Sequence, residues 1–577
     1  MKHRLICSLL AIYAASLPIF SQEALKSTEE EYYDFLSLQG LAERPTLGYR
    51  TLSDNEWILT EDAKTADENV WKNNSLGSKW TVYEPAQKID NFFTRGIDQS
   101  IKVKAYGPEW YNSYNTAAPY GQNDGALWQG KGFNSSLTAG ARLEAYGLEV
   151  TFKPQLSFSQ NREFDYIKPN YPTVDENNNL TIYNEKADTY GYYGVQFIDA
   201  PQRFGDKAFW TYDWGDTEIR YSWHSVTAGV GTQAIWLGPA RLNPIIHSNN
   251  APSYPKLDVG LRKTAIYMPY FGWYLGDLEG RAWWGKLTES DYFDNDTNND
   301  SNLIAGMAAT YAFPGIFDGL SIGFNRIMLS KWNDISSYSL TRVFLPKMDG
   351  GYDAADQRFS FTFDYILPKA GFEVYLEWAR NDFSPDMDYI IRYPFHTQAW
   401  TFGAEKAFNF SPKYGLKVLL ELTYLENSAD YDRLINWYTT FYSHSEITQG
   451  HTNRGQWLGA GIGTGGNSQY LGFEFFHPKG SVTLFAQRRN PDLDYTMYID
   501  AKNDATNISN GIFNAEGNIR CNLDFGISTI YYFTQNIMLS GAFVFEDERN
   551  PLNKTESFGE SDHRYNCSFS LGTKYSF

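Results

Sequence analysis

The C-terminal residues 564–577 alternate between two faces, one largely apolar and one polar. The apolar face carries Tyr565, Cys567, Phe569, Leu571, Thr573, Tyr575 and Phe577. A period of two is that of a β-strand, and about ten residues cross a bilayer when the strand is tilted. The pattern therefore predicts a membrane-crossing strand. The alternative, an edge strand of a soluble β-sandwich, is disfavoured because the same alternation recurs upstream.

About 18 segments with this alternation follow one another along the chain. They lie near 98–107, 135–146, 148–159, 217–224, 225–232, 256–268, 270–287, 303–313, 319–330, 357–367, 371–380, 396–410, 414–426, 469–476, 481–489, 517–533, 537–547 and 564–577. Their connections alternate between short turns, as at 368–371, and long polar loops, as at 160–216 and 427–468. Bacterial outer-membrane barrels have this alternation. We therefore predict an all-β fold, an antiparallel transmembrane β-barrel of about 18 strands.

Composition excludes several other classes of protein. Aromatic residues reach 17%, and so many rings must be buried or lie at an interface, which excludes a disordered chain. No run of about 18 apolar residues follows the N-terminal segment, which excludes a helical membrane protein. The formal charge of −19 and a pI near 4.9 argue against nucleic acid as a partner.

The cysteines give a test of the strand register. Cys521 and Cys567 each share an apolar face with their neighbours, and the predicted strand 537–547 separates the two strands that carry them. Their Cα atoms would then be too far apart for a disulfide, so we expect two free thiols that face lipid.

The chain is expected to divide into three parts. These are a signal peptide at 1–21, an N-terminal helical periplasmic or plug segment at 22–95, and the barrel at 96–577. In the second part, capping boxes at Ser27-x-x-Glu30 and Thr28-x-x-Glu31 predict one helix, and Ser53-x-x-Glu56 predicts the start of another.

The stretch from Trp236 to Pro255 does not fit a membrane strand. It is too rich in Pro and Asn for a strand and too apolar for an exposed loop, which predicts a loop folded into the barrel lumen. Two interpretations stay open, a structural plug and a direct contact with ligand. The candidate residues are Trp236, Gly238, Pro239, Arg241, Ser248, Asn249 and Asn250.

This stretch resembles the Wzi family of capsule-assembly proteins. The matching elements are Trp236, Gly238-Pro239, Ile245-Ile246 and Ser248-Asn249-Asn250-Ala251 followed by a Pro. The N-terminal piece also matches, at Tyr33 to Leu41, at Pro45 and at Trp57, and a third, weaker match runs from Arg454 to Leu471. Ala240 and His247 depart from the family pattern, and the long loops diverge. The resemblance implies an outer-membrane lectin of 18 strands that holds capsular polysaccharide on the cell. The divergent loops leave the glycan undetermined.

Aromatic residues in the predicted loops are further candidates. Trp210, Trp214 and Trp437, together with Trp110, Tyr111, Tyr212 and Tyr438, lie outside the predicted hydrocarbon band. Flat rings flanked by polar side chains can stack on sugar faces, but they can equally pack loop against loop. Both interpretations stay open.

Charged residues are expected on the inner face of the barrel. By parity this face includes Arg220, Lys256, Arg262, Arg520, Arg564 and Lys574 together with Glu218, Asp258 and Asp524. Ion-pair ladders that stiffen the wall are the simpler interpretation, and an anion-tolerant channel is the alternative.

No motif predicts catalysis, a cofactor or a metal. The Gly461-x-Gly463-x-x-Gly466 match lacks a strand-to-helix unit, and Asp294-x-Asp296-x-Asn298 lacks the Gly and Glu of a calcium loop. A porin for small solutes or oligosaccharides is the main rival function, and an outer-membrane hydrolase is a third. The expected partners are surface polysaccharide, outer-membrane lipid and, through Phe577 at the end of the last strand, the barrel-assembly machinery. We expect a monomer.

Overall fold

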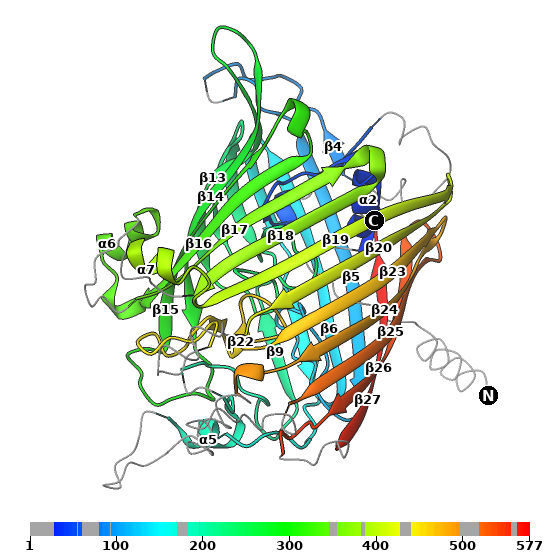
Figure 1. Cartoon of the computed structure of the whole chain (residues 1–577). Coiled ribbons are helices and arrows are strands. Elements are labelled where there is room, and N and C mark those ends of the chain that lie inside the picture. Colours follow the sequence, from blue (N-terminus) through cyan, green and yellow to red (C-terminus); the bar gives the residue numbers. More distant parts are fainter. Residues whose placement is uncertain are drawn as a thin grey trace, which may run out of the picture.

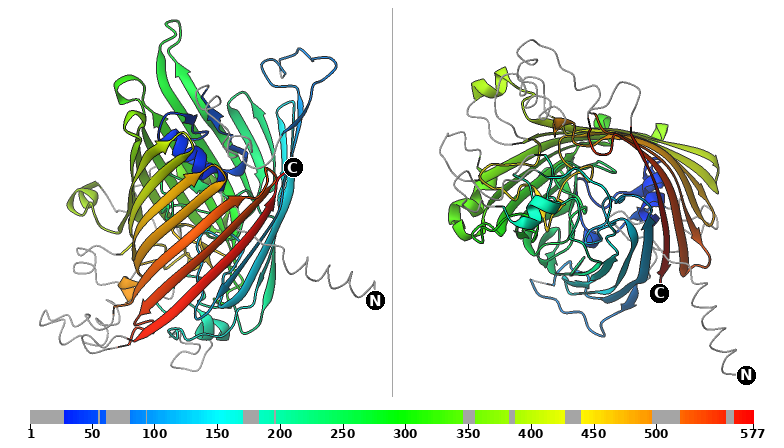
Figure 2. Two further views of the ribbon diagram at one scale, coloured as in Figure 1. Left: turned by 90° about the vertical axis from the view of Figure 1, so that its right-hand side faces the viewer. Right: turned by 90° about the horizontal axis from the view of Figure 1, so that it is seen from below.

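The computed structural model describes residues 28–54, 56–60, 80–92, 94–169, 183–194, 197–345, 355–381, 387–426, 440–495, 519–554 and 562–577. A single antiparallel sheet closes on itself to form a barrel (Figures 1 and 2). The predicted signal peptide and the capping residue Ser27 lie outside the described residues.

The wall follows chain order, and its last strand pairs with its first. The strands are β5 (Ile101–Asn115), β6 (Gly132–Ala145), β7 (Leu148–Phe152) continued by β8 (Gln155–Ser159), β9 (Phe209–Asp213) continued by β10 (Glu218–Trp223), β11 (Val226–Gly231), β13 (Lys256–Tyr267), β14 (Tyr274–Thr288), β15 (Ser301–Ala312), β16 (Leu320–Lys331), β17 (Ala355–Leu367), β18 (Phe372–Asn381), β19 (Gln398–Ser411), β20 (Tyr414–Tyr424), β23 (Asn467–His477), β24 (Gly480–Asn490), β25 (Cys521–Tyr532), β26 (Ile537–Arg549) and β27 (His563–Tyr575). They occupy 18 positions, which confirms the predicted fold and strand number.

The sequence prediction missed part of this wall. Residues 209–213, expected in a long loop, form β9, and β5 runs on to Asn115 rather than ending near 107. The predicted strand 148–159 is broken into β7 and β8 at Lys153-Pro154, because proline cannot donate to a ladder.

Side chains alternate between the two faces of the wall as the sequence pattern predicts. Along β27, Tyr565, Phe569 and Leu571 are exposed on the outside, whereas Asn566 and Ser568 are buried on the inside. An apolar exterior around a polar interior is the distribution of a transmembrane barrel. No helix among the described residues is long and apolar enough to cross a membrane.

The two cysteines lie where the register predicts. β26 separates β25, which carries Cys521, from β27, which carries Cys567. Both thiols are free, as expected.

Short turns and long connections gather at opposite ends of the barrel, which we call the turn rim and the loop rim. The turn rim includes 368–371, 412–413 and 478–479, and the loop rim includes the described residues of 116–131, 425–426, 440–466, 491–495 and 519–520. Outside the wall, the described elements near the two rims are β4 (Thr81–Tyr83), β21 (Thr452–Asn453), β22 (Gln456–Trp457), α5 (Glu185–Tyr190), α6 (Ser337–Thr341), α7 (Met387–Arg392) and the 3-10 turns η2 (Gly315–Phe317), η3 (Trp332–Asp334), η4 (Arg342–Phe344) and η5 (Pro368–Ala370).

The N-terminal segment lies inside the barrel near the turn rim (Figure 2). Helix α2 (Thr28–Ser37) is buried on all sides from Tyr32 to Ser37, and the rings of Phe35 and Phe476 stack at 4.8 Å. Short strands β1 (Ala42–Glu43), β2 (Tyr49–Arg50) and β3 (Ile58–Leu59) follow, and β1 pairs with β3.

The prediction of a second helix in the N-terminal segment is wrong. A short 3-10 turn, η1 (Leu52–Asp54), stands where that helix was expected to begin. Ser53 does not cap a helix, because its hydroxyl donates to Glu218 at 2.6 Å and accepts from Gln233 at 2.6 Å. A tertiary contact replaces the local one that the capping box predicts.

Candidate functional site

Residues 236–255 fold into the lumen, and we call them the plug. Their strand β12 (Trp236–Leu237) pairs with β2 of the N-terminal segment. Leu237, Ile245 and Ile246 are fully buried in a core that also contains inward-facing wall residues such as Trp283. The segment that fitted neither a strand nor an exposed loop is therefore an internal one.

Carboxylates of the wall hold the backbone of the plug. Glu421 of β20 accepts hydrogen bonds from the amides of residues 241–243 at 2.7 to 3.2 Å, and Glu377 of β18 accepts one from the amide of Ile245 at 2.8 Å. Glu279 of β14 does the same for residues 47–49 of the N-terminal segment. Irregular backbone has no ladder partner, and an unpaired buried amide is costly, so each carboxylate supplies acceptors that the local fold lacks.

Arg241 of the plug lies among acidic side chains on the inner face of the barrel wall and on α2. Its guanidinium donates to Glu373 at 2.9 Å and to Glu405 at 3.1 Å, and lies 3.5 Å from Asp34 of α2. Oxygens of these three acids lie within 4.8 Å of one another, a spacing that could also hold a metal ion. Positive charge there comes from Arg241, from Arg44 at 2.8 Å from Asp34, and from Lys417 at 3.9 Å from both Asp34 and Glu405. The network ties α2, the plug and the wall together.

Ion-pair ladders follow the wall where the parity of the strands predicts them. Arg220 pairs with Glu218 at 3.0 Å and with Asp258 at 2.5 Å. Further pairs are Arg262–Glu149, Arg489–Asp524, Arg520–Asp492 and Arg564–Glu548. The ladder interpretation is confirmed for Arg220, Arg262, Asp524 and Arg564. Arg520 and Asp492 instead pair in the loops beyond β25 and β24, and Lys256 donates to the backbone oxygen of Gln233.

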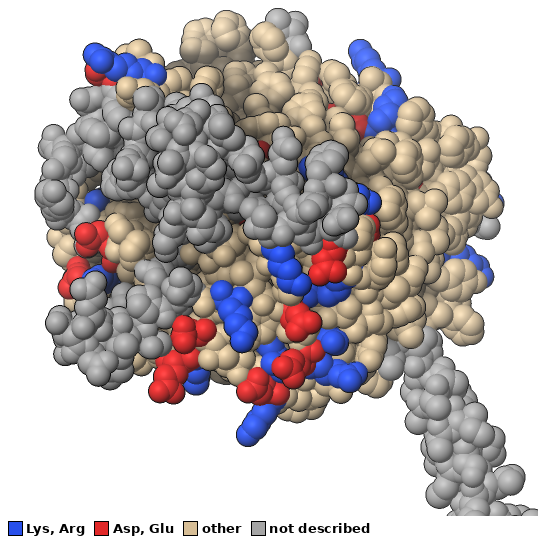
Figure 3. All heavy atoms as spheres, turned by 60° about the horizontal axis from the view of Figure 1, so that its bottom comes forward, with Lys and Arg blue, Asp and Glu red and all other residues tan. Residues whose placement is uncertain are grey.

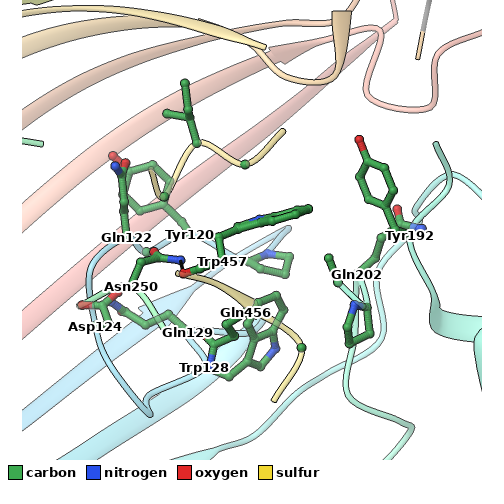
Figure 4. A pocket seen from close by; sticks show the side chains of 18 of the residues that line it. Tyr120, Gln122, Asp124, Trp128, Gln129, Tyr192, Gln202, Asn250, Gln456 and Trp457 are labelled. Carbon is green, nitrogen blue, oxygen red and sulfur yellow. Dashed lines mark hydrogen bonds between the residues drawn. The ribbon is translucent and has the colours of Figure 1, made fainter. Parts of the chain in front are cut away.

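A cavity of about 260 Å³ lies at the loop rim, next to the plug. Figure 4 shows Tyr120, Gln122 and Asp124 on one side of it and Tyr192 and Gln202 on the other. Its wall is assembled from four segments of the loop rim together with the plug, and the plug contributes Asn250. The lining is rich in aromatic rings and side-chain amides, as in pockets that combine apolar surface with a few oriented polar groups.

The aromatic rings of the cavity are held in fixed positions. Trp457 packs edge-on to Tyr192 with ring centroids 5.9 Å apart, and the guanidinium of Arg489 lies 5.6 Å from the ring of Tyr120. The amide of Asn250 donates to the backbone oxygen of Trp457 at 3.1 Å, so the plug also positions this part of the wall. Rings held in this way offer flat surfaces at little cost in conformational entropy.

Two carboxyl groups line the cavity, and burial perturbs both. Burial raises the pKa of Asp124 to about 7, against a smaller lowering effect from its hydrogen bond with Gln129. Burial likewise raises the pKa of Asp492 to about 6, against the lowering effects of Arg520 and Tyr192. Both groups therefore change charge near neutral pH.

The residues that the sequence singled out as candidates lie in different parts of the barrel. Trp236, Gly238, Pro239, Arg241, Ser248, Asn249 and Asn250 all lie in the plug, but of these only Asn250 lines the cavity. Trp210 lies on β9 and is 67% exposed, with its ring 5.0 Å from that of Phe158, so its assignment to a loop is wrong. Trp214 follows β9 and packs on Tyr212. Trp437 lies outside the described residues.

Two plug candidates have structural roles. Gly238 has φ +78°, which favours glycine, and its amide donates to Gly48 at 2.8 Å. The hydroxyl of Ser248 donates to the backbone oxygen of Gly459 at 2.6 Å.

The sequence prediction missed most of the cavity. Tyr120, Trp128, Tyr192 and Trp457 come from loops that are far apart in the chain. One signal was present, because Trp457 falls between Arg454 and Gly459 in a segment that carries a weak family match.

The loop at Asp294 uses its acidic side chains locally. Asp294 accepts from the amide of Asp296 at 2.8 Å, and Asp296 accepts from the amide of Asn298 at 3.1 Å. These contacts are Asx turns, which stabilise the loop without a ligand.

Comparison with known proteins assigns this architecture. A family model described as capsule assembly protein Wzi matches residues 113–553, about three quarters of the chain. Among solved structures, an Escherichia coli protein described as Wzi, an outer-membrane protein involved in group 1 capsule assembly and a carbohydrate-binding β-barrel, is similar over 97% of this chain and 100% of its own, at 11% identity and a TM-score of 0.56. At 11% sequence identity, this structural similarity establishes the fold alone.

Other barrels are less similar. OccAB4 of Acinetobacter baumannii covers 82% of this chain and 97% of its own at 8% identity and a TM-score of 0.38, and OprD of Pseudomonas aeruginosa covers 82% and 92% at 8% and 0.36. Neither supports a functional argument. A comparison with curated proteins gives no match.

Proposed function

Because the chain belongs to the Wzi family of capsule assembly proteins, we propose that it is an outer-membrane lectin that holds capsular polysaccharide on the cell surface. The carbohydrate binding described for the Escherichia coli barrel supports this function. In this proposal the polymer is bound and released without chemical change.

One observation carries the proposal, namely the aromatic and amide-lined cavity at the loop rim. Rings such as Trp457 and Trp128 offer flat apolar surfaces for sugar faces. Side-chain amides and carboxylates offer donors and acceptors for hydroxyl groups. The loop rim is the end that faces the medium in a barrel of this kind, so the cavity is placed to meet a surface polymer.

The plug favours a binding protein over the rival porin. The lumen holds helix α2, the plug and their network of buried ion pairs, in the space where a porin has its channel. Reconstituted protein should therefore give no large, stable conductance steps. Such steps would support the porin instead.

The residues of the cavity favour binding over catalysis. The described lining contains no Ser, Thr, Cys or His side chain that could act as a nucleophile or base of a triad. A glycosidase could use two carboxyl groups such as Asp124 and Asp492, so hydrolysis of the polymer must be measured directly. Purified protein incubated with the polymer should leave the number of reducing ends unchanged.

Partitioning of the polymer between cells and medium tests the proposal. In a deletion strain, the total polysaccharide should be unchanged while most of it moves from washed cells to the medium. Complementation with the wild-type chain should restore cell-bound polymer, and complementation with Trp457→Ala should not. An unchanged partition in the deletion strain would contradict the retention function for that polymer.

A further inference from the structure

The charged groups of the cavity restrict which sugars it can accept. Only three charged side chains line it among the described residues, namely Asp124, Arg489 and Asp492. Two of these are carboxylates, and the third is the only cation available to a bound anion. Whether Arg489 is free therefore decides which charge the cavity favours.

Arg489 is already neutralised by the wall. It lies on β24 and pairs with Asp524 of β25 at 2.9 Å and with Glu546 of β26 at 2.7 Å. The guanidinium of Arg489 also lies over the ring of Tyr120. An arginine with two carboxylate partners adds no net positive charge to the cavity, and a sugar acid would have to compete with both partners.

The two cavity carboxylates differ in their partners. Asp492 accepts from the hydroxyl of Tyr192 at 2.6 Å and pairs with Arg520 at 3.4 Å. Asp124 accepts from the amide nitrogen of Gln129 at 2.6 Å, and no lysine or arginine among the described residues pairs with it. Asp124 is therefore a partly buried carboxylate whose described donors are all uncharged.

We propose that this cavity takes an uncharged sugar residue of the polymer and rejects a uronate. The inference rests on the proposed function and adds the class of sugar. A sugar hydroxyl or an acetamido N–H donates to Asp124, whereas the C6 carboxylate of a uronate has no proton to donate where the matched hexoside has a hydroxyl, and it brings a like charge near Asp124.

The inference concerns this cavity and not the whole polymer. A neighbouring cavity of about 700 Å³ shares Trp128 and Gln456 with it and is lined by both signs of charge, namely Lys186, Lys207 and Arg454 together with Asp206, Glu289 and Asp291. Acidic and basic side chains are intermixed on the part of the loop rim visible in Figure 3. A polymer with acidic residues could therefore place them outside the inner cavity, so the test must use single sugars.

The test uses purified full-length protein in detergent micelles at pH 8.5, above the pKa of about 7 of Asp124, so that this carboxyl is ionised. The probes are the methyl glycosides of glucose, galactose, mannose, N-acetylglucosamine and N-acetylgalactosamine, and the matched methyl uronates of the first three. Binding is measured by saturation-transfer NMR with competition titrations. At least one uncharged glycoside should bind, and uronates should bind about tenfold more weakly than their matched hexosides. In Asp124→Asn this preference should shrink, and Trp210→Ala serves as the control on the outer wall.

The outcomes separate the inference from the function on which it rests. A uronate that binds as tightly as its matched hexoside, or a preference unchanged in Asp124→Asn, overturns the inference alone. If purified polymer binds but no single glycoside does, the cavity is not where the protein binds sugar. The inference then fails, while the lectin function itself stands. If the polymer itself does not bind, the lectin function fails as well.

Discussion

Arg241 of the plug donates hydrogen bonds to both carboxylate oxygens of Glu373 on β18, each at 2.9 Å. The same nitrogen also reaches Glu405 on β19. A loop residue thus supplies positive charge to a buried, acidic part of the barrel wall. The plug and the wall are therefore electrostatically dependent on each other, and each is unfavourable without the other.

Replacing Arg241 should destabilise the barrel. Arg241→Met keeps the length of the side chain but leaves Glu373 and Glu405 without this partner. Breaking one side of a buried ion pair costs about 3–5 kcal/mol. The free energy of unfolding in urea should fall by this amount for protein refolded into detergent micelles. Arg392→Gln, at an exposed position on α7, is the control and should unfold like the wild type. Equal stability of the two variants would contradict a structural role for the network.

Removing a wall carboxylate should loosen the internal backbone segment that it holds, although Glu421 also accepts from the hydroxyl of Tyr375 in the wall at 2.7 Å. Glu421→Ala leaves the amides of 241–243 without their acceptor, and each unsatisfied amide costs about 1–3 kcal/mol. Hydrogen exchange measured by mass spectrometry should therefore accelerate at 241–243. Glu279→Ala is the matched control, because it should accelerate exchange at 47–49 instead. Identical exchange patterns in the two variants would show that the carboxylates do not act locally.

Trp457 should contribute most of the apolar contact with sugar. Trp457→Ala removes a ring that lines the cavity, and loss of a buried aromatic anchor weakens binding about tenfold or more. Affinity for purified polysaccharide, measured by surface plasmon resonance, should fall accordingly. Trp210→Ala removes a ring of similar size from the outer wall and should leave the affinity unchanged. A loss in Trp210→Ala equal to that in Trp457→Ala would place the binding surface elsewhere.

The plug should loosen in acid because of His247. Burial, followed by the effect of Lys256, lowers the pKa of His247 to about 4 from an ordinary value near 6.5. Its contribution to stability is present above pH 6.5 and is lost as the pH falls through 4, because the unfolded chain binds the proton first. The loss approaches about 3 kcal/mol, from a shift of this size. His247→Gln should remove this share of the acid sensitivity, measured as urea stability between pH 7 and 4.5.

The control for this prediction is His224→Asn, an exposed position in the turn between β10 and β11. Asparagine suits the positive φ of His224, which is +54°. An unaltered pH profile in His247→Gln would contradict the assignment. A second buried histidine, His451, has its pKa lowered well below the ordinary value by burial, so part of the acid sensitivity should persist.

Sequence periodicity predicted those parts of the fold that depend on local pattern. β27 and the short turns follow from alternation and from residues such as Pro368 that end strands. β9 was missed because its alternation covers only five residues, too few to stand out from a polar loop. The helix predicted at Ser53 failed because Glu218 and Gln233, distant in sequence, take its hydroxyl.

The candidate site was predicted only where one segment carried an unusual composition. The plug was recognisable because an apolar, Pro-rich stretch fits neither a strand nor an exposed loop. The cavity was not, because its rings at Tyr120, Tyr192 and Trp457 become neighbours only after the barrel closes. A single sequence does not state which loops meet at a rim.

The position of α2 sets an order of events during biogenesis. This N-terminal helix packs against Phe476, Tyr532 and Met538, which belong to strands near the end of the chain. Glu31 and Lys417, an ion pair inside the barrel, are 386 positions apart. An early segment of the chain can therefore make its full set of contacts only after strands from the last fifth of the chain are in place. Closure of the barrel by β27 and β5 and burial of α2 are therefore consequences of the same last strands.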